Sequence, residues 1–353
     1  MKHLSTVASA ALISLALAQG AVAQDMPPRA IGSLDVDAAT TAPLQVTRSV
    51  HLDAAPETIF ATIADNENWV SWFDSLESVE GQDGSRTFTF TGGQGALTEN
   101  IVAFDEPSVF AWSISEGNPL GLENHLGALH VMPDAEDGEG SVVSLSVFYN
   151  HPDLAGIAPV TEGGGATITD ALVSVHGGSV TQEVFGTDKI TIRTTRVTDA
   201  SVAELWGVMV DGFGDVAQWS SVISEATLFG ETGTSNDGLL GVGRKCFIPG
   251  FGSEVEERVV EVNREAGRFA YEVLAGLPPF ASNGLSQWEF EDLGDGTTRV
   301  TSTITMDIAE GTPGMALGMT KAQFGQLMTM SIDEFVHFVR TGEPHPRELA
   351  SRS

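Results

Sequence analysis

Short stretches in which apolar and polar residues alternate, each followed by turn residues, dominate the second half of the chain. This alternation is typical of β-strands that bury one face. Turns such as Pro249-Gly250 and Gly294-Asp295-Gly296 separate the stretches. The pattern predicts seven strands, at residues 189–197, 222–229, 243–248, 254–263, 268–274, 282–292 and 297–308. Two short helices are expected between the first two strands, the first of them over residues 201–210.

The half ends in a long segment with helical periodicity. Apolar residues recur at three and four positions from Phe324 to Val339, until Gly342 and Pro344 end the pattern. Thr312 is the expected cap, and Pro313 suits the first helical position. The apolar stripe of this helix must pack against the concave face of the sheet. Because twisted strands and a straight helix cannot touch along their whole length, a space between them is expected.

The first half repeats this order of elements. Residues 53–60 match 199–206, residues 110–114 match 269–273, and residues 141–149 match 299–307. The two copies join near residues 184–188. Strands are expected at 44–52, 76–81, 86–91, 97–104, 110–115, 125–133 and 141–149, and a closing helix at about 166–184. Gly177-Gly178 should kink or fray that helix, because glycine weakens helices.

The N-terminus has the features of an export signal. A basic residue, Lys2, precedes an apolar stretch, and Ala21-Val22-Ala23 forms a small-x-small cleavage site. Cleavage after Ala23 would place the mature protein in the periplasm or outside the cell. No stretch has the length of a membrane span, so stable membrane insertion is not expected. The predicted organisation is a signal peptide (1–23), a linker (24–43), two domains (44–186 and 187–342) and a C-terminal tail (343–353).

The charge balance excludes some partners. The chain of 353 residues has 48 acidic and 17 basic residues, a formal net charge of -31. Nucleic acid and anionic membrane surfaces are therefore improbable partners, since both require clustered cations. Cys246 is the single cysteine, so no intramolecular disulfide can form. Its strand-like neighbours predict a small buried hydrophobe.

Polar chemistry is sparse in the sequence. His125 and His130 are five residues apart, which places them on opposite faces of a strand, and no histidines have metal-ligand spacing. The repeat aligns His130 with Trp288, so His130 is expected to line or edge a cavity. Glu99 and Glu257 occupy near-equivalent positions and could sit in the pocket as acids. Because strand carboxylates beside basic residues such as Arg258 are usually solvated, we expect them to be solvated. The sequence contains no cofactor fingerprint, and no metal or cofactor is expected.

The order of elements resembles the START and polyketide-cyclase superfamily, known as SRPBCC. The second copy carries the clearer motifs, at residues 241–246, 257–261 and 268–273, and the first copy matches mainly at 55–60 and 69–72. The resemblance implies an α+β fold of two tandem helix-grip domains, each a curved antiparallel seven-stranded sheet around a long C-terminal helix. It also implies that a bulky apolar molecule binds between sheet and helix, and that some members are enzymes.

Strand alternation and the closing helix give a set of candidate ligand-binding residues. In the second copy these are Cys246, Tyr271, Trp288, Ile304, Met306 and Met328, and in the first copy Phe104, Trp112, His130 and Phe148. Plain core packing is the alternative interpretation for each of them.

Three functions are compatible with these observations. The favoured one is an exported binding or carrier protein for a hydrophobic small molecule, such as a lipid or polyketide-like compound. The second is a cyclase, dehydratase or hydrolase that uses Tyr271, His130 or Glu257 as acid or base. The third is a non-catalytic interaction module with collapsed cavities and an acidic surface that binds a basic partner. The sequence specifies neither the ligand, nor the oligomeric state, nor how the domains are oriented.

Overall fold

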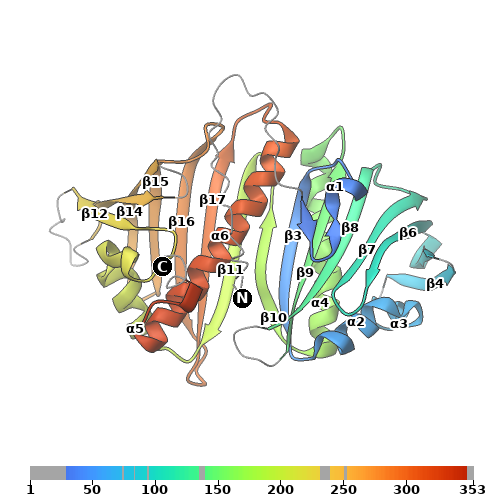
Figure 1. Ribbon diagram of the computed structural model, residues 1–353, viewed down its shortest axis with the longest axis horizontal. Coiled ribbons are helices and arrows are strands. Elements are labelled where there is room, and N and C mark those ends of the chain that lie inside the picture. Colours follow the sequence, from blue (N-terminus) through green and yellow to red (C-terminus); the bar gives the residue numbers. More distant parts are fainter. Residues whose placement is uncertain are drawn as a thin grey trace, which may run out of the picture.

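One antiparallel sheet of fifteen strands runs through the whole molecule (Figure 1), in the order β12-β13-β14-β15-β16-β17-β11-β10-β3-β9-β8-β7-β6-β5-β4. The computed structural model describes residues 29–73, 75–82, 84–93, 95–134, 140–230, 239–249 and 253–347. The expected signal peptide therefore lies outside the described residues. The strand order divides the sheet into two groups of seven strands, one in each half of the chain, joined by β10 (Ser179–Phe185). We call these halves domain 1 and domain 2.

Domain 1 has seven strands, two small helices and a closing helix, as the sequence predicts. Its elements are β3 (Leu44–Leu52), α2 (Pro56–Ala64), α3 (Asn66–Trp72), β4 (Leu76–Gln82), β5 (Ser85–Phe90), η1 (Thr91–Gly93), β6 (Ala96–Asp105), β7 (Val109–Glu116), β8 (Glu123–Pro133), β9 (Ser141–Asn150) and α4 (Leu154–His176).

Domain 2 repeats the arrangement. Its elements are β11 (Lys189–Thr198), α5 (Val202–Trp206), the π-helical turn η2 (Gly207–Asp211), the 3-10 helix η3 (Phe213–Gln218), β12 (Glu225–Phe229), β13 (Gly243–Ile248), β14 (Ser253–Asn263), β15 (Arg268–Ala275), β16 (Ala281–Asp292), β17 (Thr298–Ile308) and α6 (Gly314–Thr341). Pro313, and not Thr312, is the N-cap residue of α6, and Gly342 ends the helix in the left-handed conformation.

The closing helix of domain 1 differs from the prediction at both ends. Helix α4 begins at Leu154, twelve residues before the expected start, and continues through Pro159 and Gly163-Gly164-Gly165. Gly177, with φ of 74°, ends the helix, so the Gly177-Gly178 pair is a terminus and not a mid-helix kink. The residues that follow leave the helix and form strand β10, which pairs with both β3 and β11.

The two closing helices lie on opposite faces of the continuous sheet. In Figure 1, α6 crosses in front of the strands and α4 lies behind them. The side chains of β10 show the same division. Gln182 donates to the Gly325 carbonyl of α6, whereas its neighbour Glu183 accepts from Arg48, which in turn donates to the Ala166 carbonyl of α4. Successive residues of a strand point to opposite faces, so the two helices must cover different sides.

Residues 29–43 form ordered structure in place of the expected linker. Strands β1 (Ala30–Ile31) and β2 (Leu34–Asp35) and helix α1 (Val36–Ala39) contribute to an apolar cluster with β7, β8 and β9. The side chain of Arg29 donates to the Thr40 and Ala42 carbonyls. Domain 1 therefore buries both faces of its central strands, one under α4 and the other under this N-terminal segment.

Helix α6 also connects the domains at the junction. A Cβ atom at Gly318 would lie 2.8 Å from the backbone nitrogen of Leu44, so the helix approaches β3 more closely than a side chain would allow. One turn further, the buried Lys321 ammonium donates to the Gln45 carbonyl over 2.8 Å. The first half of α6 thus packs on β3 of domain 1 as well as on β11 and β17, and its second half closes domain 2.

Candidate functional site

A cavity of about 120 Å³ lies in domain 2 between the sheet and α6. Apolar side chains form most of its wall, with a few polar groups among them. Its lining includes Met209, Trp219, Ser220, Arg244, Cys246, Glu257, Tyr271, Ser286, Trp288, Ile304, Phe324, Leu327, Met328 and Ser331.

A second cavity, of about 190 Å³, lies in domain 1 between the sheet and α4. Its wall is more apolar and contains more aromatic rings. The lining includes Trp69, Phe73, Arg86, Phe88, Phe90, Leu97, Glu99, Trp112, Leu122, His125, Leu145, Val147, Thr161, Gly165 and Ile168. The interiors of both domains are therefore not solid, which removes the premise of the interaction module with collapsed cavities.

A buried arginine–glutamate pair sits in the wall of each cavity. In domain 1, Arg86 Nε donates to Glu99 over 2.8 Å, and in domain 2 Arg244 Nε donates to Glu257 over 2.5 Å. All four side chains are buried. The expectation that Glu99 and Glu257 are solvated is therefore wrong, because each carboxylate has an arginine on the adjacent strand to compensate its charge.

Burial shifts the pKa values of the groups around these cavities. Desolvation raises the pKa of Glu99 to about 7, against the opposing effect of Arg86. Desolvation also raises the pKa of Tyr271 and that of Cys246 to about 12, so both stay protonated at neutral pH. His125 loses its charge for the same reason, since burial lowers its pKa to about 4. The cavity walls are thus largely uncharged apart from the two ion pairs.

Five of the six candidate residues in domain 2 line its cavity: Cys246, Tyr271, Trp288, Ile304 and Met328. Met306 does not. It packs with Val184, Ile190 and Leu317 in a cluster that also contains Ile304 and Met328. Cys246 is buried as predicted.

In domain 1, Trp112 is the one candidate of four that lines the cavity. Phe104 is 56% exposed and lines an open groove on the side of α2, where it meets the ring of Phe60. His130 and Phe148 lie on the outer face of the sheet. His130 packs against Gly32, and the guanidinium of Arg29 lies 5.6 Å from the Phe148 ring centroid.

A slip of one residue in the repeat alignment explains the misplacement of His130. Trp112 pairs with Gly127, and its counterpart Tyr271 pairs with Ser286. Two residues further along, the counterpart of Trp288 is Leu129, not His130. On a strand a shift of one residue exchanges the faces. His125 faces the cavity, in agreement with the predicted separation of the two histidines. His130 therefore cannot serve as an acid or base in this cavity.

The two arginines are site residues that the sequence analysis missed. A signal for them was present, because Arg86 precedes Arg244 by the same 158 residues that separate Glu99 from Glu257. The structure adds a common environment. The guanidinium of Arg86 lies 4.3 Å from the Trp69 ring centroid, and that of Arg244 lies 4.2 Å from the Phe213 centroid.

Two mainly apolar cavities beneath long helices, in two copies of one helix-grip fold, define a class of hydrophobic-ligand-binding proteins. A family model described as "Polyketide cyclase / dehydrase and lipid transport" matches residues 43–176 and again residues 189–336. The chain belongs to this SRPBCC family, with two copies of the family domain in tandem. A comparison with curated proteins found no match.

Among solved structures, the chain is similar to two di-domain aromatase/cyclases. BexL, from the BE-7585A biosynthetic pathway, is 15% identical, with 83% of this chain and 96% of that chain covered and a TM-score of 0.34. StfQ, from the steffimycin pathway, is 11% identical, with 83% and 98% covered and a TM-score of 0.36. A truncated norcoclaurine synthase from Thalictrum flavum is 16% identical, with 43% and 93% covered and a TM-score of 0.34.

Two further observations concern the described residues. None of their helices has the length and apolar character needed to cross a membrane. Within the same ranges, no three His, Cys, Asp or Glu side chains gather in a way that could hold a metal ion.

Proposed function

We propose that the protein is a binding or carrier protein that holds a small hydrophobic molecule in each of its two cavities. The observation that carries this proposal is the mainly apolar cavity beneath each closing helix. Binding energy would come from the burial of apolar surface, at about 25 cal/mol per Å². The few polar groups in each wall would orient the ligand.

The stoichiometry of an apolar probe tests the proposal. Naphthalene is small and carries no hydrogen-bonding group, and we expect two molecules to bind per chain, as measured by equilibrium dialysis. Gly165→Leu should fill the domain 1 cavity, because a Cβ atom there lies 3.4 Å from Leu145 in a buried part of α4. Ser331→Phe should fill the domain 2 cavity from α6. Each variant should bind one molecule, and the double variant none.

Matched substitutions on the outer faces of the same helices provide controls. Val175→Leu on α4 and Gln326→Phe on α6 alter exposed positions and should leave the stoichiometry at two. Absence of naphthalene binding to the unmodified chain, or equal binding by the cavity-filled double variant, would contradict the proposal.

Catalysis on the bound ligand is the second candidate. The observation in its favour is that Tyr271, Arg244 and Glu257 meet in the wall of the domain 2 cavity. With its raised pKa, Tyr271 would act as a hydrogen-bond donor or general acid and not as a base. Mass spectrometry of the ligand recovered from native protein separates the candidates. A carrier returns the molecule unchanged after prolonged incubation, whereas an enzyme returns a product.

We also propose that the protein is exported, on the basis of the signal-like sequence of residues 1–23. The intact mass of protein from its own cell envelope tests this. The mature chain should begin at Gln24, and a mass that retains the first 23 residues would contradict export by this route.

A further inference from the structure

The guanidinium of Arg86 is buried with most of its hydrogen-bonding capacity unused. The residue is 1% exposed, and its Nε donates to Glu99. Within the described chain, neither Nη1 nor Nη2 has a hydrogen-bond partner. A buried charged donor without an acceptor is costly, so a group that supplies acceptors at this position would be bound favourably.

The equivalent arginine of domain 2, Arg244, has a hydrogen-bond acceptor that Arg86 lacks among the described residues. Arg244 Nη1 donates to the Phe213 carbonyl over 2.9 Å, in addition to its bond with Glu257. The Trp69 ring of domain 1 stacks on Arg86 as Phe213 stacks on Arg244. No described backbone carbonyl, however, reaches the Nη atoms of Arg86. The two domains thus share the ion pair but differ in the acceptor.

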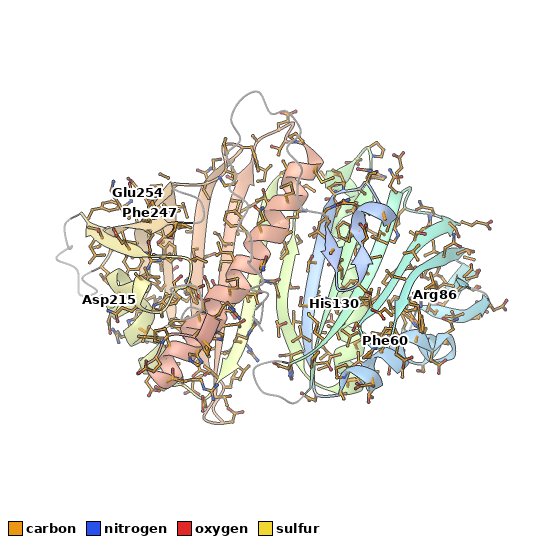
Figure 2. All side chains as sticks on the ribbon, viewed as in Figure 1. Phe60, Arg86, His130, Asp215, Phe247 and Glu254 are labelled. Carbon is orange, nitrogen blue, oxygen red and sulfur yellow. The ribbon has the colours of Figure 1, made fainter. Side chains whose placement is uncertain are left out.

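Arg86 lies at the boundary between two openings of domain 1, toward its outer end (Figure 2). It contributes to the wall of the cavity beneath α4 and also to that of the open groove near α2, which has a volume of about 510 Å³. The rings that surround its guanidinium belong to Trp69, Phe88, Phe110 and Trp112, with centroids 4.3 to 5.5 Å away. Aromatic rings thus surround the guanidinium where it meets the cavity wall.

Other donors close to this cavity also lack acceptors. The indole nitrogen of Trp72, whose ring is 4.5 Å from that of Trp69, has no partner in the described chain. Nδ1 of His125, which lines the cavity and in a neutral ring either donates or accepts, also has no partner among the described residues. The indole and guanidinium nitrogens can only donate. A ligand that fits this surplus of donors must offer several acceptors and no donor, and an ionised carboxylate has this property.

We propose that the domain 1 cavity binds a small amphiphile through its carboxylate, which accepts hydrogen bonds from Nη1 and Nη2 of Arg86 while its hydrocarbon part occupies the cavity beneath α4. This assignment rests on the proposed function of the same cavity. The fork of a guanidinium matches a carboxylate in a bidentate arrangement, and Nε remains available to Glu99. In domain 2, Arg244 already donates to a carbonyl, so we expect no preference for a carboxylate in that cavity.

A second carboxylate next to Arg86 has a consequence for Glu99. Two carboxylates that share one guanidinium repel each other, which favours protonation of one of them. Burial already raises the pKa of Glu99 to about 7. Binding of the ligand anion above this pH should therefore be accompanied by uptake of a proton from the buffer onto Glu99.

Octanoate and 1-octanol form a matched pair of probes, because they share the chain and differ in the head group. Isothermal titration of the full mature chain carrying Ser331→Phe confines binding to domain 1. We expect octanoate to bind at least tenfold more tightly than 1-octanol at pH 7.5. Arg86→Met should weaken octanoate binding at least tenfold and change 1-octanol binding less than twofold. Arg244→Met, the matched change in domain 2, should affect neither.

Glu99→Gln keeps the experiment decisive if Arg86→Met does not fold. It retains the guanidinium and should preserve or tighten octanoate binding. In the unmodified chain, proton uptake makes the measured binding enthalpy depend on the ionisation enthalpy of the buffer. Glu99→Gln should abolish this dependence. Equal affinities for acid and alcohol, or acid binding unaffected by Arg86→Met, would overturn the carboxylate assignment and leave the carrier function standing. Failure of both probes and of naphthalene to bind would overturn the proposed function together with this inference.

Discussion

Glu257→Leu should reduce the free energy of unfolding by about 3 to 5 kcal/mol, because it leaves the Arg244 charge buried without its partner. Arg244 is almost fully buried, and its guanidinium cannot escape the penalty by deprotonation. Burial alone would lower the pKa of Arg244, but Glu257 raises it above its ordinary value. The double variant Arg244→Met/Glu257→Leu should recover most of the lost stability, since it replaces the pair with apolar side chains. Urea unfolding followed by circular dichroism measures these differences.

An ion pair one residue away provides the control. Lys245 and Glu256 are also 2.5 Å apart across β13 and β14, but both are partly exposed. Lys245→Met should therefore cost less than about 1 kcal/mol, as is usual for surface pairs. A similarly small loss for Glu257→Leu would show that water reaches the Arg244 pair.

Lys321→Met should change the dependence of stability on pH. Burial lowers the pKa of Lys321 to about 8, with partial compensation from Glu162, whereas the ordinary value for lysine is 10.5. The folded state therefore binds fewer protons than the unfolded state between pH 8 and 10.5, and stability contributed by this group rises with pH over that interval. A difference of about 2.5 pH units corresponds to roughly 3 kcal/mol. Relative to the unmodified protein, the variant should therefore lose roughly that amount between pH 7.5 and 10.5.

The measurement compares urea unfolding of both proteins over this pH series. At pH 7.5 the variant should be the more stable of the two, after allowance for the lost hydrogen bond to Gln45. Lys189→Met, on the exposed surface of β11, should show no such trend. If the difference between Lys321→Met and the unmodified chain is constant with pH, the ammonium is not desolvated at the junction.

Strands with one buried face could be predicted from the sequence. The start of α4 and the strand β10 could not, because local sequence does not determine them. Alternation located β13 to the residue. The bounds of β3 were also predicted to the residue, although both of its faces are buried. The start of α4 was missed because Pro159 and the glycines at 163–165 are typical of loops, whereas here they continue a helix that packs on the sheet beside Leu145. The sequence pattern places residues 179–184 in the helix, because nothing local distinguishes a strand that joins the two halves of one sheet.

Alternation along the strands also limits how well the residues of the site can be predicted. The domain 2 candidates were mostly right, because the outer face of that sheet is polar and the apolar set is unambiguous. In domain 1 the N-terminal segment covers the outer face, so β8 and β9 carry buried apolar residues on both faces and alternation does not identify the cavity face. Arg86 and Arg244 were missed because a charged residue on a strand is expected to face solvent unless an oppositely charged partner is identified. Here each partner lies on the adjacent strand.

The position of α4 and α6 on opposite sides of one sheet bears on how the protein could be loaded and emptied. A flat donor or acceptor, such as a bilayer or a broad protein surface, can rest against one side at a time. In the carrier role proposed above, the two cavities would then exchange their ligands from different sides of the sheet.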